Sequence, residues 1–199
     1  MLSTTDKIEK RLFDIVLSAV GIGMTWWVMV FAWIVATFET KSNGLFIQER
    51  IGKDAKLFLV FKIKTMKSVS GVDTTVTKSG DVRITKSGAF FRATKIDELP
   101  QLFNVLLGNM SFVGPRPDVK GYADVLEGED RIVLSVRPGI TGPASLKYRD
   151  EESILATKDN PEEYNRDVIW ADKVQINKNY VQEWSLKKDI IYIIKTIIG

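Results

Sequence analysis

A long uncharged run of hydrophobic residues lies near the N-terminus, at residues 15–38. As a helix rising about 1.5 Å per residue, the run reaches roughly 36 Å, which exceeds a bilayer hydrocarbon core of about 30 Å. It is longer than the ~7–15-residue hydrophobic region of a signal peptide, so we interpret it as a membrane helix. The pattern therefore predicts two parts, a membrane segment at residues 1–40 and a more polar body at residues 41–199.

Basic residues flank this hydrophobic run on both sides, so the positive-inside rule does not choose an orientation. The flanking cations are Lys7, Lys10 and Arg11 before the run and Lys41, Arg50, Lys53, Lys56, Lys62 and Lys64 after it. A re-entrant helix, which bends within the membrane and returns to the same face, satisfies both flanks. Gly21, Gly23 and Thr25 are the candidates for a bend, because the run contains no proline. A simple span is the alternative.

The remaining sequence predicts a helix-rich, mixed α/β body. Two short runs rich in β-branched and aromatic residues, separated by GKDAK, indicate a hairpin. A Ser/Thr/Lys/Gly-rich stretch predicts a loop that is mobile without ligand. Two later stretches have helical spacing. In order, these are strands at 45–51 and 57–63, the loop at 67–90, a helix at 98–108 ending at Gly108, and helix at 161–184.

The C-terminal residues 185–199 predict an amphipathic helix. Its isoleucines share one face and its lysines lie beside that face: Ile190, Ile194, Ile197 and Ile198, with Lys187, Lys188 and Lys195. A helix of this kind can lie on a membrane surface. A C-terminal helix packed on the core explains the pattern equally well.

Composition excludes much chemistry. The chain of 199 residues has no Cys and no His, which rules out disulfides, thiolate zinc sites, Cys nucleophiles and Ser-His-Asp triads. Catalysis must then rely on carboxylates, Lys, Arg, hydroxyls or a metal held by oxygen ligands. The formal net charge of +3 is small, and no Lys/Arg stripe alternates with aromatic residues, so we expect no nucleic-acid partner.

Two adjacent carboxylates, Asp97 and Glu98, stand at the start of the helix predicted at 98–108. One interpretation is structural: Asp97 caps the helix and Glu98 complements its dipole. The other is chemical. A helix N-terminus attracts phosphate, a carboxylate can attack phosphorus to form an acyl phosphate, and its neighbour can hold Mg²⁺ or move a proton.

Phosphate chemistry also needs cations, and the sequence offers five in suitable places. These are Arg92, five residues before Asp97; Arg116, between two prolines; Arg137, before a proline; and Lys62 and Lys64, at the end of the second strand. A stiff backbone reduces the entropy lost when a charged side chain is ordered. Arginine also binds phosphate oxygens through two parallel hydrogen bonds.

Five motifs in this order resemble those of the bacterial sugar transferases, the monotopic phosphoglycosyl transferase family. They are KRLFD at residues 10–14, FIQERIG at 46–52, FKIKTM at 61–66, DELPQLFNVLLGNMSFVGPRP at 97–117 and VRPGITG at 136–142. The resemblance covers nearly the whole chain. The chain departs from the family pattern in one place. Family members commonly carry Ser-Pro midway along the membrane helix, where this chain reads MTWW at 24–27.

The resemblance implies a bacterial enzyme that transfers a phosphosugar from a UDP-sugar to a polyprenol phosphate such as undecaprenyl phosphate, releasing UMP. It implies a re-entrant membrane helix, a cytosolic α/β catalytic domain at 41–199 and amphipathic interfacial helices at the cytoplasmic face of the inner membrane. Asp97 corresponds to the nucleophile and lies near Mg²⁺, while Glu98 acts as a base or a positioning group. Arg92, Arg116 and Arg137 correspond to phosphate- or nucleotide-binding positions, and Lys62 and Lys64 are further substrate-binding candidates.

Two other functions are compatible with the residues. One is a membrane-surface, Mg²⁺-dependent hydrolase that cleaves a nucleotide sugar with water. The other is a non-catalytic scaffold of a glycan assembly complex, in which Asp97 only caps a helix. A homodimer is compatible with the sequence, which does not require one.

Overall fold

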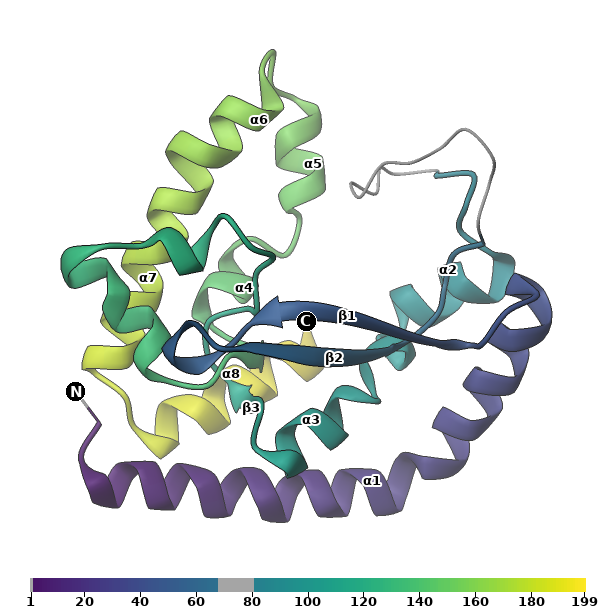
Figure 1. Cartoon of the computed structure of the whole chain (residues 1–199), viewed down its shortest axis with the longest axis horizontal. Coiled ribbons are helices and arrows are strands. Elements are labelled where there is room, and N and C mark those ends of the chain that lie inside the picture. The colour runs from purple at the N-terminus through teal and green to yellow at the C-terminus, as the bar shows by residue number, and fades with distance from the viewer. Residues whose placement is uncertain (1, 68–80) are drawn as a thin grey trace.

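A computed structural model describes residues 2–67 and 81–199 of the chain (Figure 1). Eight α-helices occur in these ranges: α1 (Thr4–Thr40), α2 (Lys86–Ala93), α3 (Gln101–Leu107), α4 (Pro143–Lys147), α5 (Glu151–Ala156), α6 (Pro161–Tyr164), α7 (Ala171–Gln182) and α8 (Leu186–Ile198). The strands are β1 (Leu45–Ile51), β2 (Leu57–Ile63), β3 (Ser111–Val113) and β4 (Gly139–Thr141). The helix-rich, mixed α/β body predicted from the sequence is confirmed.

Helix α1 begins with a capping box, in which Ser3 and Asp6 exchange hydrogen bonds between side chain and backbone. It is the one helix among the described residues that is long and apolar enough to cross a membrane. Its exposed side is hydrophobic, from Leu12 through Met24 to Phe38. Its buried side begins with polar residues, including Lys10, Asp14 and Ser18. Apolar side chains on the outside and polar ones on the inside are the arrangement expected of a lipid-facing helix.

Helix α1 continues through the positions where we expected a bend, without a break in the helix. Figure 1 shows it running beneath the body and turning upward before it joins β1. The Thr25 hydroxyl donates to the Gly21 carbonyl over 2.7 Å, and bonds of this type from Thr bend helices gently. Gly21 also lets Leu102 of α3 approach, since an added Cβ would lie 3.2 Å from a Leu102 methyl carbon.

The body contacts α1 along its length. Near the N-terminus, Lys10 Nζ is bonded to the Asp189 carboxylate of α8, and both side chains are buried. The Asp14 carboxylate accepts hydrogen bonds from Ser111 Oγ and the Phe112 N–H, each at 3.0 Å. Toward the other end, Ala32 and Ala36 pack against Ile63 of β2 and Phe91 of α2. Both ends of α1 therefore contact the same body.

The predicted hairpin is confirmed with the predicted bounds. β1 and β2 pair antiparallel with Leu45 opposite Ile63 and Ile51 opposite Leu57. The prediction of a loop over residues 67–90 is wrong at its end, because α2 begins at Lys86. Thr85 caps this helix by accepting a hydrogen bond from the Gly88 N–H, and Phe91 is buried against α1. Residues 68–80 of that loop lie outside the described residues.

A second, two-stranded sheet pairs β3 and β4 in parallel. It contacts α8, and its residues Phe112 and Ile140 pack in one cluster with Val60 of the hairpin. The segment predicted as helical at 161–184 is α6, a π-helical turn at Asn165–Trp170, and α7. Tyr180 and Val181 of α7 form one hydrophobic cluster with Val113 and Val136. Helix α8 is present where predicted, and its isoleucines Ile190, Ile194, Ile197 and Ile198 are exposed rather than buried in the core.

Candidate active site

The two carboxylates predicted to carry the chemistry lie in a short 3-10 turn, Ile96–Glu98, that precedes α3. Lys95 enters this turn with φ of 59°, in the left-handed region. The expectation that Asp97 caps the helix is wrong, because Pro100 occupies the capping position of α3 and no side chain caps either turn. No hydrogen bond from a helix N–H group to the Asp97 side chain is recorded among the described residues.

The Asp97 carboxylate is mostly buried, and one of its oxygen atoms lacks a hydrogen bond. Its Oδ1 atom is buried and has no hydrogen-bond partner among the described residues. Burial raises the pKa of Asp97 above its ordinary value, and the neighbouring Glu98 carboxylate adds to this effect, while Lys62, Lys95 and Arg92 oppose it. A buried carboxylate oxygen without a partner is costly, which indicates that a ligand or ion completes this site.

Glu98 is held by two cations. Lys62 Nζ donates to Glu98 Oε1 over 3.0 Å, and Arg116 Nη2 lies 3.7 Å from the same oxygen. Burial by itself would raise the pKa of Glu98, but Lys62 and Arg116 outweigh it and lower the pKa below the ordinary value. The adjacent carboxylates thus differ in environment. Glu98 is neutralised by protein cations, and Asp97 is left with an unpaired oxygen.

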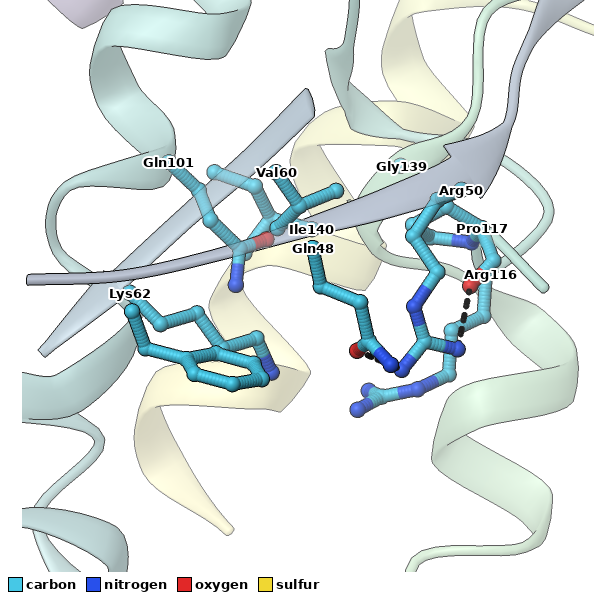
Figure 2. Close-up of a pocket in the computed structure, with 10 residues that line it drawn as sticks. Gln48, Arg50, Val60, Lys62, Gln101, Arg116, Pro117, Gly139 and Ile140 are labelled. Atoms are coloured by element: carbon cyan, nitrogen blue, oxygen red, sulfur yellow. Dashed lines mark hydrogen bonds between the residues drawn. The ribbon is translucent and has the colours of Figure 1, made fainter. Parts of the chain in front are cut away.

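Lys62 and Arg116, the two cations that hold Glu98, also line a pocket (Figure 2). One face of the hairpin supplies alternate residues of each strand, and α3, the 115–117 loop and β4 close the other sides. The lining residues are Phe46, Gln48, Arg50, Val60, Lys62, Gln101, Arg116, Pro117, Gly139 and Ile140. Figure 2 shows Gln48, Arg50 and Arg116 converging on one region of it. Three cations on an apolar floor suit an anionic group such as a diphosphate.

The structure brings only some of the predicted cations to this pocket. Lys62 and Arg116 are there, and Arg92 lies close enough to Asp97 to oppose the rise in its pKa. Lys64 instead donates to Ser42 Oγ over 2.7 Å. Arg137 donates from Nε to the Gly108 carbonyl over 2.6 Å, at the C-terminal end of α3. Their substrate-binding roles stay predictions.

Sequence reasoning assigned no role to three polar residues of the pocket. Arg50 donates to Gln48 Oε1 over 2.7 Å, so the two side chains form one unit on β1. Gln101 is buried, with only 4% of its surface exposed, and no hydrogen-bond partner is recorded for it within the described ranges. The alternation of Phe46, Gln48 and Arg50 along a predicted strand was the available signal, since it places them on one face.

The residues present fit a single divalent cation that is shared with a substrate. No cluster of three or more His, Cys, Asp or Glu side chains suited to a metal occurs among residues 2–67 and 81–199. Mg²⁺ is commonly bound by one or two carboxylates together with substrate phosphates, so it does not need such a cluster. Asp97 Oδ1 is the unpaired oxygen that would serve.

The fold thus combines a helix long and apolar enough to cross a membrane with a pocket whose cations Lys62 and Arg116 also contact Glu98. The model of the bacterial sugar transferase family matches residues 5–199. The chain therefore belongs to the bacterial sugar transferase family, as its motifs predicted.

Relatives with named activities cover nearly all of this chain. A UDP-glucose:undecaprenyl-phosphate glucose-1-phosphate transferase of Caulobacter vibrioides is 33% identical over 96% of this chain and 68% of its own length. The Escherichia coli protein of the same name is 33% identical over 98% of this chain and 41% of its own. A UDP-N-acetylgalactosamine-undecaprenyl-phosphate N-acetylgalactosaminephosphotransferase of Aeromonas hydrophila is 30% identical over 94% of this chain and 42% of its own. The chain thus spans less than half the length of the latter two.

Proposed function

We propose that this protein transfers a phosphosugar from a UDP-sugar to undecaprenyl phosphate through an acyl phosphate that joins the phosphosugar to Asp97. The relatives' names supply the substrate classes, and membership of the sugar transferase family supplies the reaction type. The observation that carries the residue assignment is the difference in hydrogen bonding between the adjacent carboxylates of Asp97 and Glu98. Lys62 and Arg116 contact Glu98, whereas Asp97 Oδ1 has no hydrogen-bond partner among the described residues and is available to react.

The first half-reaction is an attack by Asp97 on the phosphorus that bears the sugar. A bond forms between a carboxylate oxygen and this phosphorus, and the bond to the bridging diphosphate oxygen breaks, so that UMP leaves with that oxygen. Arg50, Lys62 and Arg116 line the adjacent pocket and would stabilise the charge that develops on the departing phosphate. Bound Mg²⁺ would supply a Lewis acid toward the same diphosphate.

In the second half-reaction, an oxygen of undecaprenyl phosphate attacks the phosphorus of the acyl phosphate. The bond to Asp97 breaks, the carboxylate is regenerated, and undecaprenyl diphosphosugar is released. A phosphate monoester loses its second proton with a pKa of about 6, so the acceptor needs little help from a base at neutral pH. The lowered pKa of Glu98 then favours a positioning role, in which it orients Lys62 and Arg116.

We further propose that α1 is re-entrant and that the body lies on the cytoplasmic face. The body contacts the N-terminal end of α1 through Lys10 and Asp14 and the C-terminal end through Ala32 and Ala36. If α1 crossed the bilayer, these ends would lie on opposite sides, and the polar body that contacts both would have to pass through the hydrocarbon core. The exposed isoleucines of α8 would lie at the same membrane surface.

The test is UMP release from a panel of UDP-sugars with Mg²⁺, with and without undecaprenyl phosphate, for wild type and Asp97→Asn. We expect sustained release only with the lipid, a stoichiometric burst without it, and neither in the variant. Mass spectrometry of the intact protein should show a phosphosugar adduct on wild type alone. Sustained release without lipid would indicate the hydrolase, and unchanged turnover in Asp97→Asn would overturn the assignment of the nucleophile.

A further inference from the structure

Asn104 is a buried amide on α3 whose side chain binds the backbone of β2. The residue is 0% exposed. Its Nδ2 group donates a hydrogen bond to the Leu59 carbonyl over 2.6 Å, and its Oδ1 atom accepts one from the Phe61 N–H over 3.0 Å. A carbonyl only accepts and an N–H only donates, so these two partners fix the orientation of the amide. The chemistry proposed above gives Asn104 no role.

These two hydrogen bonds place Asn104 on the edge of β2 that faces away from β1. Leu59 and Phe61 are two residues apart in the strand, so their backbone groups point to the same edge. The other edge of β2 pairs with β1, and the sheet has two strands among the described residues. The Asn104 side chain therefore takes the place of a neighbouring strand, pairing one donor and one acceptor that an edge strand leaves open.

Hydrophobic packing around Asn104 does not by itself fix where α3 lies along β2. Val105, the next residue of α3, packs with Val60 and Met110 in one buried cluster. Hydrophobic contacts are non-directional, so they tolerate small shifts of the helix along the strand. The two hydrogen bonds of Asn104 require particular distances and angles at the same time, and they therefore specify a single position.

The two segments that Asn104 joins carry groups of the candidate active site. Lys62 follows Phe61 directly on β2, and Glu98 lies six residues before Asn104, in the turn that leads into α3. Lys62 Nζ donates to Glu98 Oε1 over 3.0 Å. The strand and the turn with its helix are thus joined twice, once by Asn104 in the interior and once by Lys62 at the pocket.

The backbone of Asn104 extends this arrangement toward Arg116. The Asn104 carbonyl accepts hydrogen bonds from the Asn109 N–H over 2.9 Å and from the Met110 N–H over 3.1 Å. These bonds turn the chain from the end of α3 into β3, which precedes the loop that carries Arg116. Asn104 is therefore bonded to both segments that supply the cations of Glu98.

We propose that Asn104 is a positioning residue of the transfer reaction. By holding α3 at one place on the edge of β2, it sets Lys62 against Glu98 and so places a cation that stabilises the departing phosphate. Asn104 is fully buried and does not line the pocket, so it acts through Lys62. A misplacement of about 1 Å in such a site lowers the rate by about 100-fold. This inference rests on the proposed function, because that function gives Lys62 its role.

The test is a rapid-quench measurement of the UMP burst without undecaprenyl phosphate, using the full-length protein in lipid nanodiscs. It uses Mg²⁺ and a saturating concentration of the UDP-sugar that gives the largest burst in the panel. The burst amplitude counts active sites, and the burst rate constant reports the chemistry at each site. Asn104→Leu and Asn104→Ala both remove the two hydrogen bonds, and Leu keeps the side-chain volume. Each should lower the rate constant at least about tenfold, whereas a purely structural role would lower the amplitude alone.

The double variant Asn104→Leu/Lys62→Met shows whether Asn104 acts through Lys62. In the Lys62→Met variant, Asn104→Leu should lower the burst rate constant by less than about twofold, because the cation that Asn104 positions is already absent. The same fold-loss from Asn104→Leu in wild type and in Lys62→Met would overturn the inference.

Asn109→Leu is the matched control. Asn109 is exposed just after the same helix, and no hydrogen bond of its side chain is recorded in the described ranges. The control should keep the wild-type amplitude and rate constant. A wild-type rate constant per active site in Asn104→Leu and Asn104→Ala would overturn the inference. Failure of both variants to fold would also overturn it, by making Asn104 a residue of the fold alone. Absence of any UMP burst from wild type would instead overturn the proposed function.

Discussion

Lys62 Nζ and Glu98 Oε1 lie 3.0 Å apart and join strand β2 to the turn that carries Asp97. This hydrogen bond holds the Lys62 ammonium group, which lines the pocket, next to the Glu98 carboxylate. The Glu98 side chain is 14% exposed and the Lys62 side chain 25%, so the pair is partly shielded from water. Because the pair is partly buried, removing one partner should destabilise the protein, since the other charge is left without an opposite charge beside it.

Substitution Lys62→Met should lower kcat/KM for the UDP-sugar by about 100-fold, the scale of one lost electrostatic contact to a transition state. The variant both removes a cation from the pocket and leaves Glu98 with Arg116 as its remaining ion-pair partner among the described residues. Steady-state UMP release measures the effect. Lys56→Met, an exposed lysine before the same strand, is the control and should behave as wild type. Equal activity of the two variants would contradict the role of Lys62.

The UMP burst in the absence of lipid should lose rate as pH falls, with a midpoint above the ordinary range of an aspartate. Burial and Glu98 raise the pKa of Asp97, and only the ionised carboxylate is a nucleophile, so the burst is present above that raised pKa and lost below it. Glu98→Gln removes the like charge and should shift the midpoint to lower pH. A midpoint that does not move in this variant would show that another group controls the burst.

Substitution Arg137→Met should destabilise the protein by about 1–3 kcal/mol with little change in KM for the UDP-sugar, because Arg137 holds the C-terminal end of α3. Arg11 donates to the Val105 and Leu106 carbonyls at the same end, so the two arginines act together. Thermal unfolding and steady-state kinetics separate the two roles. A raised KM at unchanged stability would support the substrate-binding role predicted from the sequence.

Substitution Lys10→Met should destabilise the protein by about 3–5 kcal/mol, the usual effect of breaking a buried ion pair. Asp189 would keep the donors Tyr180 and Trp184 but lose its cation. The substitution Asp189→Asn should therefore lower the free energy of unfolding less in the Lys10→Met variant than in wild type. Unfolding of the four proteins in detergent gives the coupling, and strictly additive effects would show that the pair contributes nothing beyond its separate parts.

Single cysteines at Thr5 and Lys56 should both react with a membrane-impermeant thiol reagent from the cytoplasmic face only. Both positions are exposed. Thr5 is in the first turn of α1, Lys56 lies in the body just before β2, and the chain has no native cysteine to give a background. A cysteine at Met24, which is 69% exposed on the apolar side of α1, should be protected from both faces. Labelling of Thr5 and Lys56 from opposite faces would replace the re-entrant helix with a simple span.

The hairpin, α8 and the membrane helix were predictable because each depends on a local repeat of hydrophobic residues. The pocket was harder to predict from the sequence. It depends on the strand register that sets Gln48 opposite Val60, and on a loop distant in the sequence that brings Arg116 to the same place. Asp97 illustrates the same limit. A carboxylate before a predicted helix normally caps it, but here Pro100 occupies the capping position and the backbone turns Asp97 elsewhere. Similarly, the proline beside Arg137 gave no sign that its side chain would bind the end of α3.

Ala32 and Ala36 of α1 are almost completely buried against Ile63 and Phe91, while the opposite side of the same helix is exposed and apolar. The helix that would lie in lipid is therefore also an interior wall of the body that carries the proposed site. Deleting it would uncover the hydrophobic surface under β2 and α2, so a truncated fragment should aggregate rather than yield a soluble enzyme. With α1 in lipid as proposed, extraction should require an amphiphile that replaces the lipid, and proteolysis between α1 and the body should not release an active domain.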